Sequence, residues 1–246
     1  MGELIAVLSG KGGTGKTSVC AGVAAALAAS GRRVLCIDCD VGLRNLDISL
    51  GLSDTASLSF LEVCRGSYPI SQATAHPLYP SLRFLTAPMT CSIESIDPDA
   101  FGELVHDARK IFDFILLDAP AGVDAGFRLA ATHADRCIIV TGPGPAAIRD
   151  AERTGQLLEL MGKKNIRLIV NRVDRKMISA MNLTIDDVMD GAGLPLLGVV
   201  PEDLNVTLAA AVGMPLLKYK PRCGAARACK RIANRIQGLP EPLGLR

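Results

Sequence analysis

The sequence has no tryptophan, only three tyrosines and only 4% aromatic residues. It also lacks a long hydrophobic run: nothing approaches the roughly 20 consecutive apolar residues of a membrane-spanning helix, and the longest stretch of small apolar residues covers positions 19–29. Met1, Gly2 and Glu3 lack the basic start of a secretory signal, and Ala6 departs from the myristoylation pattern. We therefore expect a cytoplasmic protein and neither a secreted nor a membrane-spanning one.

The eight cysteines lack the partners of a metal site. Only Cys36 and Cys39 have CxxC spacing, and no second Cys/His pair completes a zinc site. These two residues begin in a predicted strand and are three positions apart, so their thiols should point to opposite faces of the sheet. We expect reduced, buried cysteines that pack as small hydrophobic residues.

The 27 basic and 25 acidic residues nearly balance, but they are unevenly placed. Residues 218–246 hold eight basic residues and one acid, a net charge of +7, whereas the preceding part of the chain carries −5. This asymmetry indicates a tail that meets anionic lipid, nucleic acid or an acidic partner. With 49% hydrophobic residues and a mean hydropathy of +0.29, the chain can bury a full core, which excludes a disordered protein.

Short, β-branched apolar runs alternate along the chain with longer stretches of helical character. The predicted strands cover residues 4–8, 34–37, 82–85, 114–117, 137–140, 167–170 and 196–200, and the main helices cover 17–29, 99–111, 146–161 and 185–191. This alternation predicts a mostly parallel sheet with helices on both faces. The expected fold is a single doubly wound α/β domain over residues 1–238, with a basic C-terminal helix at 222–237 and an irregular tail at 239–246.

A phosphate-binding motif lies between the first predicted strand and the first predicted helix. It is G-x-x-x-x-G-K-[ST], formed by Gly10, Lys11, Gly12, Gly13, Thr14, Gly15, Lys16 and Thr17 and followed by Ser18. The glycines let backbone amides approach a phosphate closely, and the helix N-terminus adds partial positive charge. Lys16 would reach the β- and γ-phosphates, and the Thr17 hydroxyl would bind Mg²⁺. The motif predicts a P-loop NTPase.

Carboxylates follow two of the other predicted strands. Asp38 and Asp40 come at the end of the strand at 34–37, and Asp118 directly follows the apolar strand at 114–117 in the Walker B form. Because α/β sheets bind ligands at the carboxyl ends of their strands, we expect these groups beside the phosphate loop. Asp118 can hold Mg²⁺ through water.

Two sequence motifs resemble those of the MinD/ParA ATPase family, which has a deviant Walker A motif. They resemble its septum-site-determining branch in particular. The first is K-G-G-T-G-K-T, starting at Lys11, and the second is D-x-D-x-G-L-R-N-L-D, from Asp38 to Asp47. The resemblance runs from Leu4 to about Leu217. It implies Mg²⁺-dependent hydrolysis of ATP to ADP and phosphate, an ATP-dependent homodimer, and MinC-like inhibitor and MinE-like or equivalent stimulator partners.

The resemblance also implies residue roles. Lys11 would reach across the dimer to the partner's phosphates, as an arginine finger does. Asp40 would orient or activate the attacking water, Asp38 would support the Mg²⁺ shell, and Asn45 would lie near the γ-phosphate. The segment at 119–122 would be a second switch, ordered by γ-phosphate contact and released on hydrolysis.

The sequence allows two interpretations of which nucleotide base is bound. Asn171 and Asp174 form an N-[KR]-x-D element like that of GTPases, in which the aspartate reads guanine. The family instead places an asparagine against adenine, which would be Asn171, with Pro201, Glu202 and Asp203 on the other side. The deviant phosphate loop favours ATP.

The tail departs from the family pattern, in which a bulky amphipathic helix inserts into the membrane. A thin apolar stripe without aromatic residues runs along it, formed by Ala225, Cys229, Ile232 and Ile236, and the basic residues Arg227, Lys230, Arg231 and Arg235 lie elsewhere on the helix. A membrane-surface helix needs a large apolar face as well as basic flanks. We expect this helix to pack on the domain, and peripheral contact with the inner face of the cell membrane is a hypothesis.

Other functions remain as alternatives. One is a ParA-like ATPase that partitions DNA or regulates flagellar number, and another is a scaffold that binds nucleotide without hydrolysing it. Intact Lys11, Lys16, Asp40 and Asp118 argue against the scaffold, and no specific nucleic acid is expected. Iron–sulfur relatives need a cysteine near the second switch, and residues 119–127 have none.

Overall fold

The computed structural model describes residues 1–41, 44–89 and 91–242, and its centre is an eight-stranded sheet. The strands lie in the order β3-β4-β2-β5-β1-β6-β7-β8, and all neighbours are parallel except β3 and β4. Their bounds are Glu3–Leu8 (β1), Val34–Asp38 (β2), Thr74–His76 (β3), Tyr79–Leu85 (β4), Phe114–Asp118 (β5), Arg136–Thr141 (β6), Ile166–Val173 (β7) and Leu196–Pro201 (β8).

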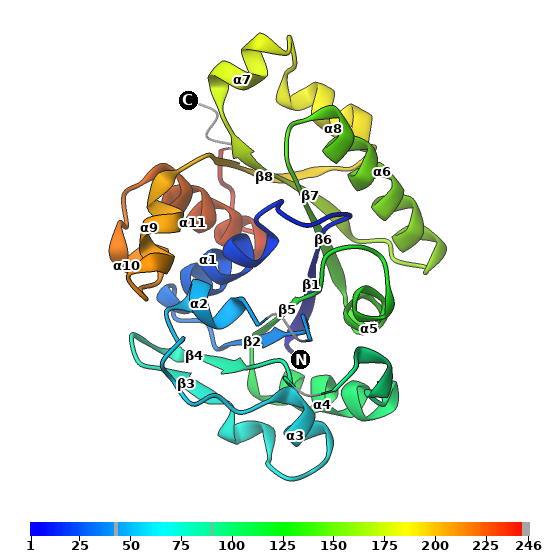
Figure 1. Ribbon diagram of the computed structural model, residues 1–246, viewed down its shortest axis with the longest axis vertical. Helices are drawn as coiled ribbons and strands as arrows, with labels where there is room; N and C mark the ends of the chain where they lie inside the picture. The colour runs from blue at the N-terminus through cyan, green and yellow to red at the C-terminus, as the bar shows by residue number, and fades with distance from the viewer. Residues whose placement is uncertain (42–43, 90, 243–246) are drawn as a thin grey trace.

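Helices cover both faces of the sheet, so the strands are apolar almost throughout (Figure 1). One face carries α1 (Lys16–Ala29), α2 (Leu46–Leu50), α9 (Leu204–Ala211), α10 (Leu216–Tyr219) and α11 (Gly224–Ile236). The other carries α3 (Phe60–Cys64), α4 (Pro98–Ile111), α5 (Ala125–His133), α6 (Pro145–Leu160) and α8 (Ile185–Ala192), with α7 (Arg175–Ala180) beyond the end of β7. The predicted doubly wound α/β fold is confirmed.

The topology places a crevice at the carboxyl end of β1. This strand lies between β5 and β6, and the chain leaves it towards β2 on one side and later returns to β6 on the other. Ligands bind in open α/β sheets at such a reversal, outside the carboxyl ends of the strands. The phosphate loop, the loop after β2 and the loop after β5 all open into this region (Figure 1).

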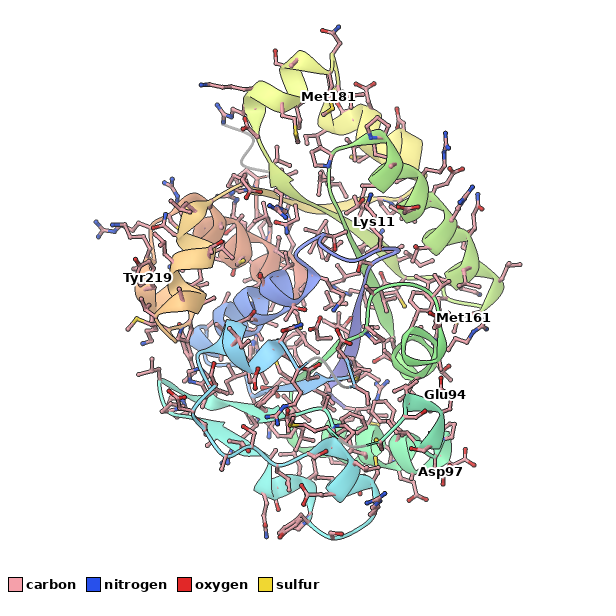
Figure 2. All side chains as sticks on the ribbon, in the orientation of Figure 1. Lys11, Glu94, Asp97, Met161, Met181 and Tyr219 are labelled. Carbon is pink, nitrogen blue, oxygen red and sulfur yellow. The ribbon has the colours of Figure 1, made fainter. Side chains whose placement is uncertain are left out.

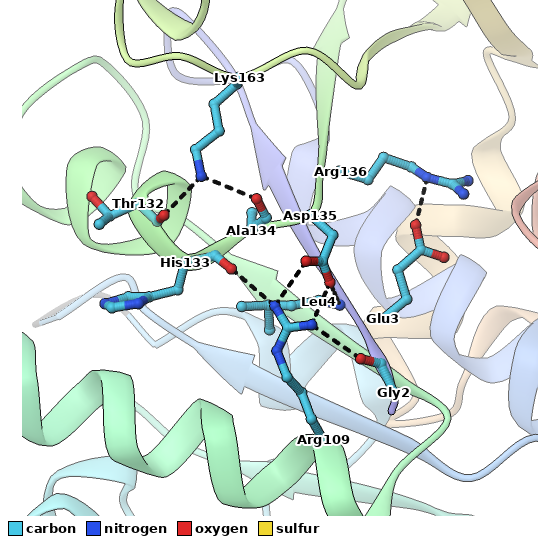
Figure 3. A network of polar contacts seen from close by, with 10 residues as sticks. All are labelled: Gly2, Glu3, Leu4, Arg109, Thr132, His133, Ala134, Asp135, Arg136 and Lys163. Atoms are coloured by element: carbon cyan, nitrogen blue, oxygen red, sulfur yellow. Dashed lines mark hydrogen bonds and ion pairs between the residues drawn. The ribbon is translucent and has the colours of Figure 1, made fainter.

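A polar network lies at the amino ends of the central strands, opposite the crevice (Figure 3). Arg109 on α4 donates to both carboxyl oxygens of Asp135, at 2.5 and 3.0 Å, and to the carbonyls of Gly2 and His133. Asp135 also accepts the backbone N–H of Leu4, the start of the central strand. These contacts hold the first residues of the chain at the amino ends of the strands, whereas the crevice lies at their carboxyl ends.

The cysteines pack as expected. Cys36 belongs to the core beneath α1 and α11, and Cys39 belongs to the core on the other face, so the two thiols do point apart. All eight cysteines are free. The described residues contain no group of three or more His, Cys, Asp or Glu side chains placed to hold a metal.

The basic tail forms a helix that is part of the domain. The stripe predicted as its apolar face, Ala225, Cys229, Ile232 and Ile236, is buried against α1 and β8. Close approach is possible because Gly198 of β8 has no side chain: a Cβ there would lie 2.4 Å from Cγ1 of Ile232. Arg235 is not a free surface charge, since its Nη1 donates to the Leu197 carbonyl at 2.7 Å on the edge strand. The prediction that this helix packs on the domain is confirmed.

We expect Ile232→Ala to lower the free energy of unfolding by about 2–4 kcal/mol, because it empties a fully packed position. Urea unfolding would measure the change. Lys230→Ala, two residues earlier in the same helix but exposed, is the matched control and should change stability by less than about 0.5 kcal/mol. Equal losses in the two variants would contradict this docking of α11.

The structure describes only part of the C-terminal tail after α11. Residues 239–242 form no helix or strand, whereas the last four residues of the predicted irregular tail lie outside the described part. None of the helices in the described ranges is both long and apolar enough to cross a membrane.

Candidate functional site

The phosphate loop has the backbone that its glycines predict. Gly13 and Gly15 have φ of +80° and +82°, in the left-handed region that favours glycine, and Gly15 is the N-cap of α1. Gly10 is required for packing, because a Cβ there would lie 2.7 Å from Thr154 Oγ1 and 2.8 Å from the Asp150 carbonyl on α6. The loop is thus clamped to α6 on one side, while α1 directs its N-terminus at the crevice.

Lys16 is buried beneath this loop and forms an ion pair with Asp118. Its Nζ lies 2.6 Å from Asp118 Oδ1 and 3.4 Å from the Thr17 hydroxyl. Burial alone would lower the pKa of Lys16, but Asp118 more than offsets this, so the ammonium is held charged. Burial raises the pKa of Asp118, against the opposing effect of Lys16 and Thr17.

Asp38 and Asp118 face each other on neighbouring strands. They are register partners at the ends of β2 and β5, and both are buried. Burial, and then repulsion from Asp118, raises the pKa of Asp38 to about 7. Asp38 Oδ1 accepts the N–H of Asp40 at 2.9 Å, and Oδ2 accepts that of Leu46 at 3.2 Å. Asp40 is half-buried, and burial raises the pKa of its carboxyl as well.

Oxygen atoms placed for a hard cation gather here. Asp118 Oδ2 is buried and has no hydrogen-bond partner among the described residues. The Asp118 carboxyl as a whole lies close to Thr17 and to Asp38. Carboxylate and hydroxyl oxygens are ligands of Mg²⁺, which usually completes its shell with water and substrate phosphates. The residues present therefore fit Mg²⁺ held together with a nucleotide.

Lys11 lies at the exposed rim of the loop beside α6 (Figure 2). Its Nζ is 3.6 Å from Asp150 Oδ2, and the two side chains are 45% and 34% exposed. An ion pair of this length and exposure contributes little stability, at most about 1 kcal/mol. Lys11 is therefore available to leave Asp150 for another anion.

Two loops that resemble switches are tied to this centre. Asn45 is exposed at the start of α2, and the loop between Asp40 and Asn45 is held at both ends by the hydrogen bonds of Asp38; Gly42 and Leu43 within it lie outside the described residues. After β5, Gly122 donates its N–H to the Ser9 carbonyl at 3.1 Å. Both loops thus contact elements that hold the phosphate site.

A pocket of about 170 Å³ lies on the other side of Gly15, and the predicted base residues line it. Asn171 on β7, with Pro201, Glu202 and Asp203 after β8, contribute to its wall along with Gly15 and Ser18. Asn171 Nδ2 donates to the Thr14 carbonyl at 2.8 Å. Asp174 caps α7 by accepting the N–H of Lys176 and does not line this pocket, which disfavours the guanine reading.

Two features of this pocket have no signal in the amino-acid sequence. Asp203 caps two helices, because its Oδ1 accepts the N–H of Asn205 in α9 and its Oδ2 accepts that of Ala225 in α11. The second contact brings α11 to the site, so Ala225 and Cys229 also line the pocket. Arg172, which donates to the Gly13 carbonyl, was also missed.

A glycine-rich loop on a parallel sheet, a buried lysine and two facing carboxylates define a P-loop nucleotide-binding protein. A family model described as the CobQ/CobB/MinD/ParA nucleotide binding domain matches residues 5–216. The chain belongs to this family.

Among curated proteins, the chain is 37% identical to the septum site-determining protein MinD of Synechocystis, over 98% of this chain and 92% of that one. It is 36% identical to MinD of Bacillus subtilis, over 99% and 92%. Among solved structures it resembles the MinC:MinD cell division protein complex of Aquifex aeolicus, with a TM-score of 0.90, 35% identity and 98% of both chains covered. MinD of Pyrococcus horikoshii complexed with Mg-ADP gives 0.85, 31% identity and 96% of both chains.

Proposed function

We propose that this protein is an ATP-hydrolysing switch that dimerises on ATP and helps to position the division septum by recruiting a MinC-like inhibitor. The observation that carries the proposal is one cluster: Lys16, Thr17, Asp38 and Asp118 beneath the phosphate loop, with Lys11 at its rim. The similarity to MinD proteins over nearly the full chain, and to MinD in a complex with MinC, supports the cellular role. A MinE-like or equivalent stimulator belongs to the same proposal.

The chemistry follows from the positions of these residues. Lys16, which now pairs with Asp118, would contact the β- and γ-phosphates of a bound nucleotide, because its charged ammonium can exchange one anionic partner for another. Thr17, Asp38 and Asp118 would hold Mg²⁺, which neutralises charge on the phosphate oxygens. Asp40 would orient the attacking water at the edge of the centre. The pocket at Asn171 and Pro201 would take the adenine base.

We expect Lys11→Ala to bind ATP but to remain a monomer. The side chain is exposed and weakly paired, so its loss leaves the pocket of its own chain intact. In a dimer it would meet the partner's phosphates, and removing it leaves that charge unneutralised. Light scattering with MgATP would measure the mass.

Lys110→Ala is the matched control for that experiment. Lys110 is also an exposed lysine paired with an aspartate, Asp107, but it lies on α4 away from the loop. This variant should dimerise like the wild type. An ATP-dependent dimer of Lys11→Ala would refute the role of Lys11 in the partner's site.

We place the protein in the cytoplasm with electrostatic contact to an anionic membrane surface. Because α11 buries its apolar face, it offers lipid only charge, chiefly from Arg227 and Lys230, with Arg222 exposed just before the helix. Each basic residue near an anionic leaflet contributes about 1 kcal/mol. Vesicles containing anionic lipid should therefore carry the MgATP-bound protein on flotation at low salt and release it at high salt. No flotation at high protein density on the vesicle would refute this contact.

A further inference from the structure

Arg172 has a strained backbone beside the phosphate loop. Its φ is +57°, a left-handed conformation that non-glycine residues seldom adopt. Here β7 carries a bulge: Val170 pairs with Val199 and Val173 with Pro201, so β7 uses two residues where β8 uses one. A bulge redirects side chains, and strain of this kind persists where surrounding contacts hold it.

The guanidinium of Arg172 joins the two sides of the nucleotide pocket. Nη1 donates to the Gly13 carbonyl at 3.2 Å, while Nε and Nη2 donate to the Glu202 carboxylate at 2.8 and 3.4 Å. The planar fork of arginine permits both contacts at once. The preceding residue, Asn171, holds the next carbonyl of the loop, that of Thr14. Two consecutive residues of the bulge therefore hold two consecutive carbonyls of the phosphate loop.

Holding these carbonyls also orients the amides of the loop. In a trans peptide the C=O and the following N–H point in opposite directions. With the Gly13 carbonyl turned towards Arg172, the N–H of Thr14 is turned away from it. The Thr14 carbonyl turned towards Asn171 directs the N–H of Gly15 in the same manner. Amides presented in this way are what a phosphate-binding loop needs.

We propose that Arg172, held by Glu202, is a positioning residue that orients the amides of Thr14 and Gly15 towards the nucleotide phosphates. Through Glu202, Arg172 also couples the loop at residues 201–203, which we call the base-side loop, to the phosphate loop. The inference rests on the proposed nucleotide binding for its function, but the contacts that carry it are within this chain.

The test uses Arg172→Gly, because glycine adopts this φ without strain yet removes both contacts. Its melting temperature should equal or exceed that of the wild type. Amide hydrogen exchange of residues 10–16 in the nucleotide-free protein should become faster, and the Kd for MgADP should rise about tenfold. Arg172→Lys should give an intermediate Kd, since one ammonium cannot reach Gly13 and both oxygens of Glu202.

Asn182→Gly is the control for strain relief. Asn182 also has a positive φ, +50°, but it is exposed after α7. This variant should keep the wild-type Kd and the wild-type exchange of the loop. A wild-type Kd and unchanged loop exchange in Arg172→Gly would overturn the proposal.

The coupling through Glu202 has its own test in Glu202→Gln. This change should raise the Kd two- to threefold in the wild-type background and leave it unchanged in the Arg172→Gly background. Additive losses in the double variant would overturn the coupling. If the wild type bound neither MgATP nor MgADP, the proposed function would fail, and loop exchange in the nucleotide-free protein would still decide whether Arg172 holds the loop.

Discussion

Replacing Lys16 with alanine should abolish nucleotide binding and also destabilise the protein near neutral pH. Binding is lost because Lys16 is the cation that would contact the β- and γ-phosphates. Stability is lost because Asp118 remains buried as an unpaired carboxylate. Breaking a buried ion pair at one partner costs about 3–5 kcal/mol. Calorimetry with MgATP and urea unfolding would measure the two losses.

The loss of stability in Lys16→Ala should depend on pH in a defined direction. Burial raises the pKa of Asp118 above 3.8, and removing Lys16 removes the group that opposes the rise. A carboxyl with a raised folded-state pKa destabilises when it ionises, so stability should fall as pH rises from about 4 through the folded-state value. At acid pH the deficit should be small.

Asp118→Asn in the Lys16→Ala background separates the two effects. It replaces the buried carboxyl with a neutral group of similar shape, so the double variant should regain stability at neutral pH. Nucleotide binding should not return. Nucleotide binding at wild-type affinity in Lys16→Ala would contradict the assigned role of Lys16.

Asp40→Ala should bind ATP and dimerise but hydrolyse ATP about 10²–10⁴-fold more slowly. Asp40 is suited to hold a water, because it is half-buried and its carboxyl oxygens accept no hydrogen bond from another described residue. Its backbone N–H, which holds Asp38, is retained in the variant. A phosphate-release assay would measure the rate.

Asp40→Asn distinguishes orientation of the water from removal of its proton. The amide can still accept a hydrogen bond from water, but it is not a base. A rate well above that of Asp40→Ala would indicate that orientation is the larger contribution. A wild-type rate in Asp40→Ala would show that the residue does not position the water.

Much of the fold could be predicted because its strands are buried on both faces and read as continuous apolar runs. All seven predicted strands and four main helices are present. The antiparallel β3 was missed, since Thr74, Ala75 and His76 are too few and too mixed in polarity to show a period. The short helix α2 was also missed, because five residues are too few to show a helical period.

The candidate site was likewise predictable only in part. Lys16, Asp38 and Asp118 could be placed together because their positions after parallel strands bring them to one edge. Their pairing could not be foreseen, since the contact of Lys16 with Asp118 depends on distances across the sheet. Arg172 was missed because nothing in the sequence marks a bulge or a left-handed residue other than glycine.

The +7 charge of residues 218–246 also changes meaning once the structure is known. The helix that carries most of it buries its apolar stripe and contributes Ala225 and Cys229 to the pocket beside the phosphate loop. Because Asp203, in the loop after β8, accepts the N–H of Ala225, this helix is a structural part of the pocket that we propose for the base. Its charge is available only on the outer surface.

The proposed ATP-dependent dimerisation is tested by the mass of the protein in solution with MgATP compared with its mass with MgADP. Asp40→Ala is the form to use beside the wild type, because slow hydrolysis should preserve the ATP state. We expect twice 25.9 kDa with MgATP and 25.9 kDa with MgADP. A mass of 25.9 kDa with both nucleotides, in protein shown to bind ATP, would contradict it.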